Sequence, residues 1–186
     1  MKNVTLLDAE SLYDNLKTQL SHNLQARLES MPSREDQAHQ QIGLIGIHTG
    51  GVWLAERLHQ DLRASFPLDA EIGKIDSAFY RDDLKARGLR PNVQPSYLPF
   101  STADKHLILI DDVLYTGRTV RGVLNEIFDY GRPASVTLAV LVDRGGHQLP
   151  IHAELAGARM ALQPQQSLVL ARSPEYTFTL TLEDAA

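Results

Sequence analysis

Residues 107–120 read Leu-Ile-Leu-Ile-Asp-Asp-Val-Leu-Tyr-Thr-Gly-Arg-Thr-Val, and this stretch decides the fold of the chain. Its four consecutive aliphatic residues predict a strand that is buried on both faces. Apolar residues then recur at positions 120, 123, 124, 127 and 128, a spacing that predicts a helix directly afterwards. The stretch is therefore a strand, a loop and a helix, and two acids stand where the strand ends.

The loop of this unit carries residue types that suit a phosphate. In an open parallel sheet, ligands collect beyond the carboxyl ends of the strands, and a helix start offers N–H groups and the positive end of the helix dipole. Glycine permits a tight turn, and threonine hydroxyls can donate to phosphate oxygens. The residues that we expect to hold the phosphate are Tyr115, Thr116, Gly117, Arg118 and Thr119.

The two acids, Asp111 and Asp112, need a different partner, because carboxylates repel a phosphate. Vicinal ribose hydroxyls would satisfy them, and so would a bound Mg²⁺, which prefers carboxylate and phosphate oxygens. A phosphate at one end and a diol at the other is the outline of a 5-phosphoribosyl group. A plainer interpretation is that Asp112 and Thr119 only cap a turn and a helix.

The composition fits one domain that spans residues 1–186, with 43% hydrophobic residues to build its core. The absence of cysteine excludes disulfides, thiolate catalysis and zinc–sulfur sites. No window approaches the roughly 20 apolar residues that span a bilayer, so we expect a soluble, cytoplasmic protein. The net charge of −5 argues against a broadly basic nucleic-acid-binding surface, although it leaves room for a local patch.

Strands and helices alternate along the chain. Leucine recurs every four residues from 12 to 28, which predicts a helix from Glu10 to about Leu28 with Asp8 as a possible cap. The remaining expected elements are strands at 42–47, within 71–80 and at 135–141, a helix that contains residues 52–62, and a late hairpin from segments 167–170 and 176–182. This order predicts an α/β fold, a doubly wound and mostly parallel sheet with helices on both faces.

The run from the apolar strand through the two acids to Thr-Gly-x-Thr resembles the type I phosphoribosyltransferases, which bind phosphoribosyl pyrophosphate (PRPP). In detail, Asp-Asp-Val-Leu-Tyr-Thr-Gly-Arg-Thr-Val at residues 111–120 resembles the PyrR family, bifunctional regulators of pyrimidine operons that are also uracil phosphoribosyltransferases. The resemblance extends from about Leu6 to about Val169. It implies a type I phosphoribosyltransferase core with Mg²⁺ as cofactor, and a small base-covering hood formed by the N-terminal and C-terminal segments.

A second glycine-containing loop, Gly-Ile-His-Thr-Gly-Gly at residues 46–51, follows the first core strand. It is also what a tight strand-to-helix connection looks like. The family resemblance implies that its residues bind pyrophosphate, namely His48, Thr49, Gly50 and Gly51. The commoner family pattern here is Lys-Thr-Arg-Gly. This chain lacks both of those cations, so Mg²⁺, Arg81 or backbone amides must carry more of the charge.

Two further segments belong to the same resemblance. Residues 79–84, followed by the Pro-containing stretch to residue 103, resemble a flap over the active site, and Arg81 is our candidate for a bidentate pyrophosphate contact. Asp-Arg-Gly-x-x-x-Leu-Pro-Ile begins at residue 143, and Arg144 is our candidate near the base or the pyrophosphate. The seven histidines show no metal-ligand spacing: His147 and His152 are isolated from the others without a carboxylate cluster, and we expect each to be a surface or hydrogen-bonding residue.

Rival nucleotide-binding motifs are absent. The chain has no Gly-x-x-x-x-Gly-Lys-Ser/Thr, no Gly-x-Gly-x-x-Gly after a strand and no Gly-x-Ser-x-Gly. The resulting hypothesis is a uracil phosphoribosyltransferase, which converts uracil and PRPP to UMP and pyrophosphate and also regulates pyrimidine biosynthetic genes. The alternatives are a nucleotide-sensing, RNA-binding regulator with weak or no catalysis, and a phosphoribosyltransferase for another base.

The regulatory hypothesis requires binding of a pyr leader RNA when UMP or UTP occupies the pocket. Residues 1–40 hold four Lys or Arg against six acids, which favours a solvated acidic helix over an RNA-binding one. Oligomerisation could nevertheless assemble a basic patch from Arg57, Arg63 and their symmetry mates. The family suggests a homodimer or a larger homo-oligomer.

Overall fold

The computed structural model of the chain describes residues 4–30, 42–76 and 95–184. Its strands are β1 (Val4–Leu7), β2 (Ile42–Ile47), β3 (Gly73–Ile75), β4 (His106–Leu114), β5 (Ser135–Asp143), β6 (Leu155–Arg159), β7 (Gln166–Arg172) and β8 (Phe178–Asp184). Its helices are α1 (Ala9–Glu29), α3 (Gly50–Leu62) and α5 (Arg118–Tyr130).

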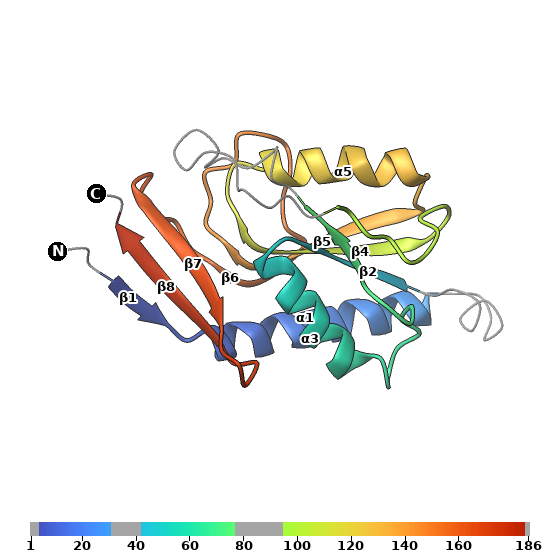
Figure 1. Ribbon diagram of the computed structural model, residues 1–186, viewed down its shortest axis with the longest axis horizontal. Coiled ribbons are helices and arrows are strands. Elements are labelled where there is room, and N and C mark those ends of the chain that lie inside the picture. Colours follow the sequence, from blue (N-terminus) through green and yellow to red (C-terminus); the bar gives the residue numbers. More distant parts are fainter. Residues whose placement is uncertain (1–3, 31–41, 77–94, 185–186) are drawn as a thin grey trace.

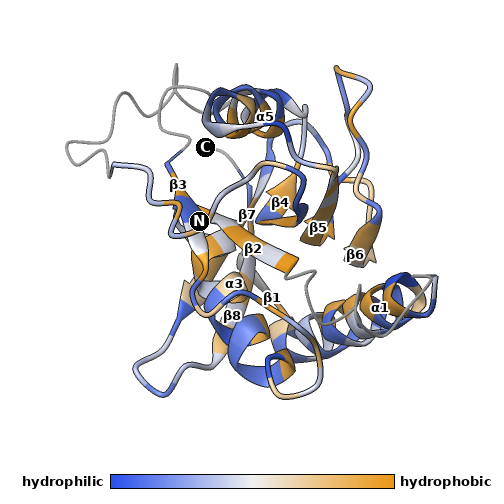
Figure 2. Cartoon of the chain, turned by 90° about the vertical axis from the view of Figure 1, so that its right-hand side faces the viewer, coloured by the Kyte–Doolittle hydropathy of each residue, from blue (hydrophilic) through white to orange (hydrophobic). Residues whose placement is uncertain are grey.

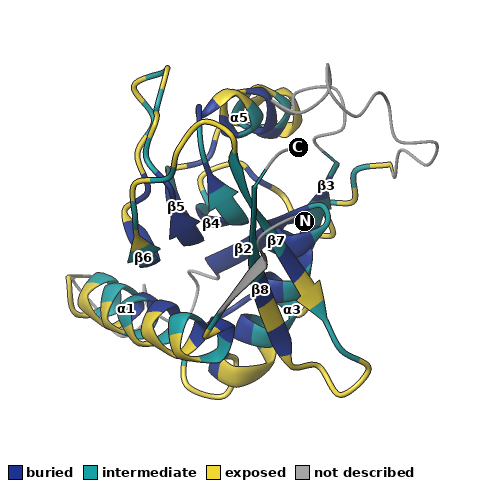
Figure 3. Ribbon diagram, turned by 90° about the vertical axis from the view of Figure 1, so that its left-hand side faces the viewer, coloured by how far each residue is buried: buried dark blue, intermediate teal, exposed yellow. Residues whose placement is uncertain are grey.

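A five-stranded sheet with the order β3-β2-β4-β5-β6 forms the centre of the molecule, and all of its strand pairs are parallel. Helix α5 covers one face, and α1 and α3 cover the other (Figure 1). This arrangement confirms the predicted doubly wound fold with helices on both faces. Figure 2 shows the apolar strands between the two layers, and Figure 3 shows that burial follows the same division.

The strand order places a topological switch point between β2 and β4. From β2 the chain passes through α3 to β3 on one side, whereas from β4 it passes through α5 to β5 on the other side. The connections after β2 and β4 therefore diverge at neighbouring strand ends. Ligands of open parallel sheets bind in the crevice at such a point.

Strand β4 supplies apolar side chains to both layers of the core. Ile108 and Ile110 belong to the cluster beneath α1 and α3, whereas Leu107 and Leu109 belong to the cluster beneath α5. All four residues are fully buried. Successive side chains of a strand point to opposite faces, so a central strand needs a continuous apolar run rather than an alternating one.

Helix α1 forms as predicted. The carboxylate of Asp8 caps it by accepting a hydrogen bond from the backbone N–H of Ser11 at 3.0 Å. Leucines four residues apart, at 16, 20 and 24, are fully buried against the sheet. One apolar stripe along the helix therefore determines which face of α1 packs against the sheet.

Strand β6 was not predicted, because its sequence Leu-Ala-Gly-Ala-Arg lacks β-branched and aromatic residues. Small residues are needed there, since a Cβ on Gly157 would collide with the backbone oxygens of Leu12 and Leu141. The amides of Asn15 and Gln19 donate to the carbonyls of Gly157 and Ala156 at 2.7 and 2.8 Å. Side chains of α1 thus satisfy the carbonyls of an edge strand.

The remaining strands form a small antiparallel sheet with the order β1-β8-β7 at one end of the parallel sheet (Figure 1). The predicted late hairpin is confirmed, with Arg172 opposite Phe178 beside its turn. Strand β1 was not predicted as a strand, and it pairs with β8 through contacts such as Leu7 with Leu180. The two ends of the described chain are therefore joined in one sheet.

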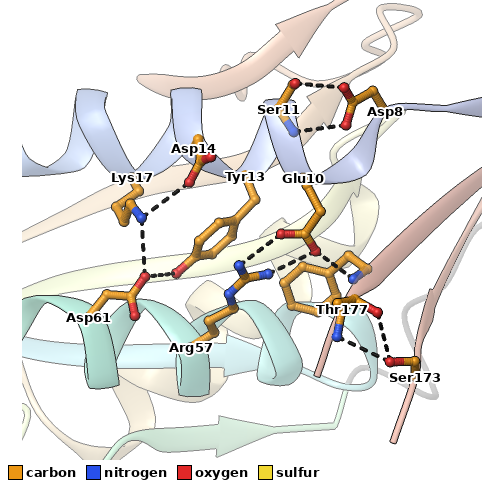
Figure 4. Close-up of polar contacts among 11 residues, drawn as sticks. Asp8, Glu10, Ser11, Tyr13, Asp14, Lys17, Arg57, Asp61, Ser173 and Thr177 are labelled. Atoms are coloured by element: carbon orange, nitrogen blue, oxygen red, sulfur yellow. Dashed lines mark hydrogen bonds and ion pairs between the residues drawn. The ribbon is translucent and has the colours of Figure 1, made fainter. Parts of the chain in front are cut away.

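A polar network joins α1, α3 and β8 (Figure 4). The carboxylate of Glu10 accepts two bonds from the guanidinium of Arg57, at 2.8 and 2.9 Å, and one from the backbone N–H of Phe178 at 2.7 Å. Tyr13, which is fully buried, donates its hydroxyl to Asp61 at 2.9 Å. Because Arg57 also lies over the Tyr13 ring at 4.1 Å, it is committed to this network.

The bounds of two expected elements need correction. Strand β4 does not end before the acids but continues to Leu114, because its pairing with β5 extends to that residue. Helix α5 already begins at Arg118, so Arg118 and Thr119 belong to the helix rather than to the loop, and the strand expected within residues 71–80 is confirmed as Gly73–Ile75. Among the described residues, no helix is long and apolar enough to cross a membrane.

His106, at the start of β4, gives a pH-dependent prediction. Its Nδ1 lies 2.7 Å from the guanidinium of Arg27 and 2.7 Å from the hydroxyl of Ser135. Burial, together with the charge of Arg27, lowers the pKa of His106 below its ordinary value of 6.5. The unfolded chain therefore takes up a proton first as the pH falls, and the free energy of unfolding should decrease from about pH 6.5 downward.

Urea unfolding at several pH values would test this, with wild type compared to His106→Gln. The stability difference between the two proteins should shrink as the pH falls below 6.5. His22→Gln, an exposed change on α1, should leave a curve parallel to that of wild type. A stability difference between wild type and His106→Gln that does not vary with pH would contradict the prediction.

Candidate functional site

Two loops meet at the switch point of the sheet. The first, at residues 48–49, joins β2 to α3, and its cis peptide bond links His48 to Thr49. The second, at residues 115–117, joins β4 to α5. A Cβ on Gly51 would collide with the carbonyl of Ile110, so the absence of a side chain lets the start of α3 lie against the end of β4. The structure therefore brings both predicted loops to one place.

Gly50 lies directly against the carboxylate of Asp112. A Cβ at position 50 would fall on Asp112, with its carboxyl carbon only 2.7 Å away. The Asp112 carboxylate thus occupies the space where a side chain at position 50 would begin. This chain therefore lacks the arginine of the commoner family pattern at the position where the Asp112 carboxylate fills the space. The sequence alone did not show that the two features are linked.

Backbone N–H groups orient the two acids. Asp111 is 7% exposed and accepts a bond from the N–H of Asp112 at 3.0 Å. Asp112 is half-buried and accepts a bond from the N–H of Val113, also at 3.0 Å. Both carboxylates stand within β4 rather than on the loop, at the part of the strand that is paired with β5 beyond the last pairing with β2 at Ile110.

The turn after β4 has the form expected for anion binding. Gly117 has a φ of +88°, which favours glycine, and it stands at the N-cap of α5. Thr116 is buried, and its hydroxyl accepts a bond from the N–H of Arg118 at 3.2 Å. Neither α3 nor α5 has an acid in its first turn or a side-chain cap. Neither helix therefore satisfies its own N-terminal N–H groups with a side chain of its first turn.

A third segment, residues 143–152, supports this turn. The backbone N–H of Gln148 donates to the carbonyl of Thr116 at 3.0 Å, and its side-chain oxygen accepts from the Arg118 guanidinium at 2.9 Å. A Cβ on Gly146 would meet the ring of Tyr115 at 2.7 Å. The turn after β4 is thus held from both sides.

Arg144 is a buried cation beside the turn. It is 7% exposed, its guanidinium lies over the Tyr115 ring at 4.0 Å, and it donates to the carbonyl of Gln163 at 3.1 Å. Its Nε has no hydrogen-bond partner within the described part of the chain. Burial lowers the pKa of Arg144, because the charged form loses its hydration. Such a cation favours a ligand that brings an acceptor or a negative charge.

The other predicted site residues have different outcomes. Arg81 and the expected flap at residues 79–84 lie outside the described residues. His147 and His152 are hydrogen-bonding residues as expected: His147 Nε2 lies 2.8 Å from Asp143 Oδ1, and the Nδ1 atoms of the two histidines are 3.1 Å apart. Five positions separate them in the chain, and only the turn of segment 143–152 brings them together.

No group of three or more potential metal ligands occurs in residues 4–30, 42–76 and 95–184. Asp111 and Asp112 nevertheless suit Mg²⁺, which commonly takes one or two carboxylates and completes its shell with water and the phosphates of a substrate. The donor set therefore fits a cation that arrives with a phosphorylated ligand.

Comparison with protein families and with known sequences gives a consistent result. Residues 11–157 match the model of the phosphoribosyl transferase domain. The chain is 48% identical to the bifunctional protein PyrR of Nitrosococcus oceani over 180 residues, which cover 96% of this chain and 94% of that protein. It is 44% identical to the PyrR of Pseudomonas savastanoi, with 97% of each chain covered, and 43% identical to that of Ralstonia nicotianae, with 93% and 94% covered.

Solved structures show the same fold at low sequence identity. A ternary substrate complex of Trypanosoma cruzi hypoxanthine phosphoribosyltransferase has a TM-score of 0.62 and 20% identity, over 85% of this chain and 81% of that chain. A hypoxanthine phosphoribosyltransferase from Staphylococcus aureus has a TM-score of 0.59 and 19% identity, over 86% and 77%. These similarities support the architecture and carry no information about the base.

Gly117→Ala tests the turn after β4. Alanine at a φ of +88° should cost about 1–2 kcal/mol of stability, and its Cβ would press on Ile151 at 3.2 Å. We expect weaker binding of ribose 5-phosphate, measured by calorimetry. Gly145→Ala is the matched control, because Gly145 has a φ of +70° with nothing within 4 Å of its added Cβ. Equal ribose 5-phosphate affinity in both variants would contradict phosphate binding at this turn.

Proposed function

Because this chain belongs to the phosphoribosyl transferase domain family and, within it, to the bifunctional PyrR proteins, we propose that it converts uracil and PRPP to UMP and pyrophosphate. We propose further that it regulates pyrimidine biosynthetic genes in response to uridine nucleotides. One observation carries the enzymatic part: Asp111 and Asp112 lie between two helix N-termini at the switch point of the sheet.

The reaction replaces pyrophosphate at C1 of the ribose by a ring nitrogen of uracil. Positive charge develops on the sugar and negative charge grows on the departing pyrophosphate. The protein then acts through positioning and electrostatics rather than through a nucleophile. Asp111 and Asp112 orient the ribose hydroxyls and balance the cationic sugar, and residues Tyr115 to Thr119 hold the 5-phosphate at the start of α5.

The pyrophosphate lies on the other side of the acids, at the start of α3. Backbone N–H groups at the start of α3 would bind it, since this helix has neither an acid in its first turn nor a side-chain cap. Asp111 and Asp112 would hold Mg²⁺, which would neutralise part of the pyrophosphate charge. For Arg81, which lies outside the described residues, the family resemblance suggests a bidentate contact to the same pyrophosphate.

The base lies near Arg144, a buried cation that is stacked on the Tyr115 ring at 4.0 Å. The small sheet β1-β8-β7 is the hood over the site, formed by the N-terminal and C-terminal segments. Its hairpin is fixed to α3 through Arg172, which donates to Glu56 at 2.8 Å. Because the hood is attached to α3, its position relative to the pyrophosphate loop at the start of α3 is fixed.

The regulatory part rests on family membership and on the same pocket. Arg57, one of the two expected RNA contacts on α3, is paired with Glu10 and stacked on Tyr13. Arg63, at the end of α3, is exposed. An RNA-binding patch assembled by symmetry would therefore depend on Arg63 more than on Arg57.

Parallel assays of PRPP with uracil, hypoxanthine, guanine and orotate test the enzymatic proposal. Pyrophosphate release should be fastest with uracil and should require Mg²⁺. Asp112→Asn keeps the shape of the side chain and the acceptor for Val113, and it should lower kcat by about 10²-fold because it removes a charge opposite the developing cation.

Asp104→Asn is the matched control, since Asp104 is an exposed loop acid whose φ of 57° asparagine also adopts. Its rate should equal that of wild type. A steady-state rate of Asp112→Asn indistinguishable from wild type would defeat the catalytic assignment. A preference for hypoxanthine, guanine or orotate would defeat the choice of uracil.

Binding of a pyrimidine-operon leader RNA tests the regulatory proposal. Its affinity should increase with UMP and fall with salt, because Lys and Arg release counterions from the phosphates. Arg63→Gln should reduce the salt slope by about 1, whereas Arg132→Gln, an exposed change near the start of β5, should not. No binding at low salt in the presence of UMP would rule out RNA binding as the regulatory mechanism.

A further inference from the structure

Two imidazole rings converge in the segment that follows β5. The Nδ1 atoms of His147 and His152 are 3.1 Å apart, and the rings meet edge to face with centroids 5.0 Å apart and planes at 71°. The His147 side chain is 18% exposed, and His152 is exposed. The pair is thus accessible from solvent, and no step of the proposed reaction uses it.

A carboxylate fixes the orientation of this pair. His147 Nε2 lies 2.8 Å from Asp143 Oδ1, and the same oxygen accepts a bond from the backbone N–H of Gly145 at 3.0 Å. Because the carboxylate only accepts, Nε2 of His147 carries a proton. In a neutral ring, Nδ1 of His147 then offers its lone pair toward His152.

We propose that His147 and His152 bind a transition-metal ion of the Zn²⁺ class between their Nδ1 atoms. A tetrahedral ion with metal–nitrogen distances of about 2.0–2.1 Å holds two nitrogens about 3.3 Å apart, close to the separation seen here. Metal-binding histidines usually donate their other ring N–H to a carboxylate, and Asp143 occupies that place for His147. The histidines therefore have both the spacing and the support that such an ion needs.

The site differs in chemistry from the one at Asp111 and Asp112. Imidazole nitrogen suits Zn²⁺, Ni²⁺ and Cu²⁺, whereas Mg²⁺ prefers oxygen ligands. Since the described residues offer no group of three ligands, two positions of the ion remain for water or another small ligand. Binding is therefore reversible, unlike that of a four-ligand structural zinc site.

The ion would lock a segment that contacts the turn after β4. Between the two histidines, Gln148 donates to the carbonyl of Thr116, and Ile151 lies against Gly117. A metal bond from residue 147 to residue 152 closes this segment into a small loop. Binding of the ion would therefore stiffen the segment that supports the turn after β4, which is expected to hold a phosphate.

Zinc titration of the full chain, stripped of metal with a chelator and free of nucleotides, tests the proposal. Saturable binding of one Zn²⁺ is expected, and ¹⁵N spectra of the imidazoles should show metal coordination at Nδ1 of both histidines. Mg²⁺ should leave these signals unchanged. Asp143→Asn should weaken Zn²⁺ binding by about 10–100-fold, because the carboxylate supports His147.

His147→Gln and His152→Gln should each abolish saturable binding, and His22→Gln, an exposed histidine on α1, should not. The ¹⁵N spectra of the wild type keep the test independent of how well the variants fold. Undiminished Zn²⁺ binding by the His147→Gln/His152→Gln double variant would overturn the proposal. So would a wild-type spectrum in which Zn²⁺ leaves both Nδ1 signals unmoved.

Discussion

The close contact between the start of α3 and the end of β4 is the constraint on which the site depends. It requires glycine at position 51, because a Cβ there would collide with the backbone of β4, whereas at position 50 the side chain of Asp112 takes the space of a Cβ. The contact brings residues 48–51, the two acids and the turn after β4 together at the switch point. It also explains how the chain can lack the arginine of the commoner family pattern and still have an ordered loop: the carboxylate takes the space.

Side chains on the outer face of α3 join this helix to β3, β7 and α1, and so fix its position in the molecule. Glu56 accepts bonds from Lys74 of β3 and Arg172 of β7, both at 2.8 Å, and Arg57 is paired with Glu10 of α1. Burial alone would raise the pKa of Glu56, but the two cationic donors outweigh it and lower the pKa. Partly exposed ion pairs contribute about 0–1 kcal/mol each, so their main effect is to fix where the hood sits relative to the site.

Much of the core could be predicted because its signals are local. The aliphatic run at 107–110, the leucines of α1 and the late hairpin each specify their own element. Strand β6 could not be predicted, since its small residues suit the close approach of α1 rather than any intrinsic preference for a strand. The end of β4 was misplaced for a related reason: two acids usually leave a strand, but pairing with β5 keeps Asp111 and Asp112 inside it.

The sequence by itself determined the fold class, the family and the residue types of a phosphoribosyl site, because Asp-Asp followed by Thr-Gly-x-Thr after a buried strand is a short, contiguous pattern. Only the tertiary structure decided which residues meet. Gly50 and Asp112 are 62 positions apart, Arg57 finds Glu10, and His147 finds His152 because a turn reverses the chain. Contacts between distant residues depend on packing the whole core, and that packing is not encoded in any single stretch of sequence.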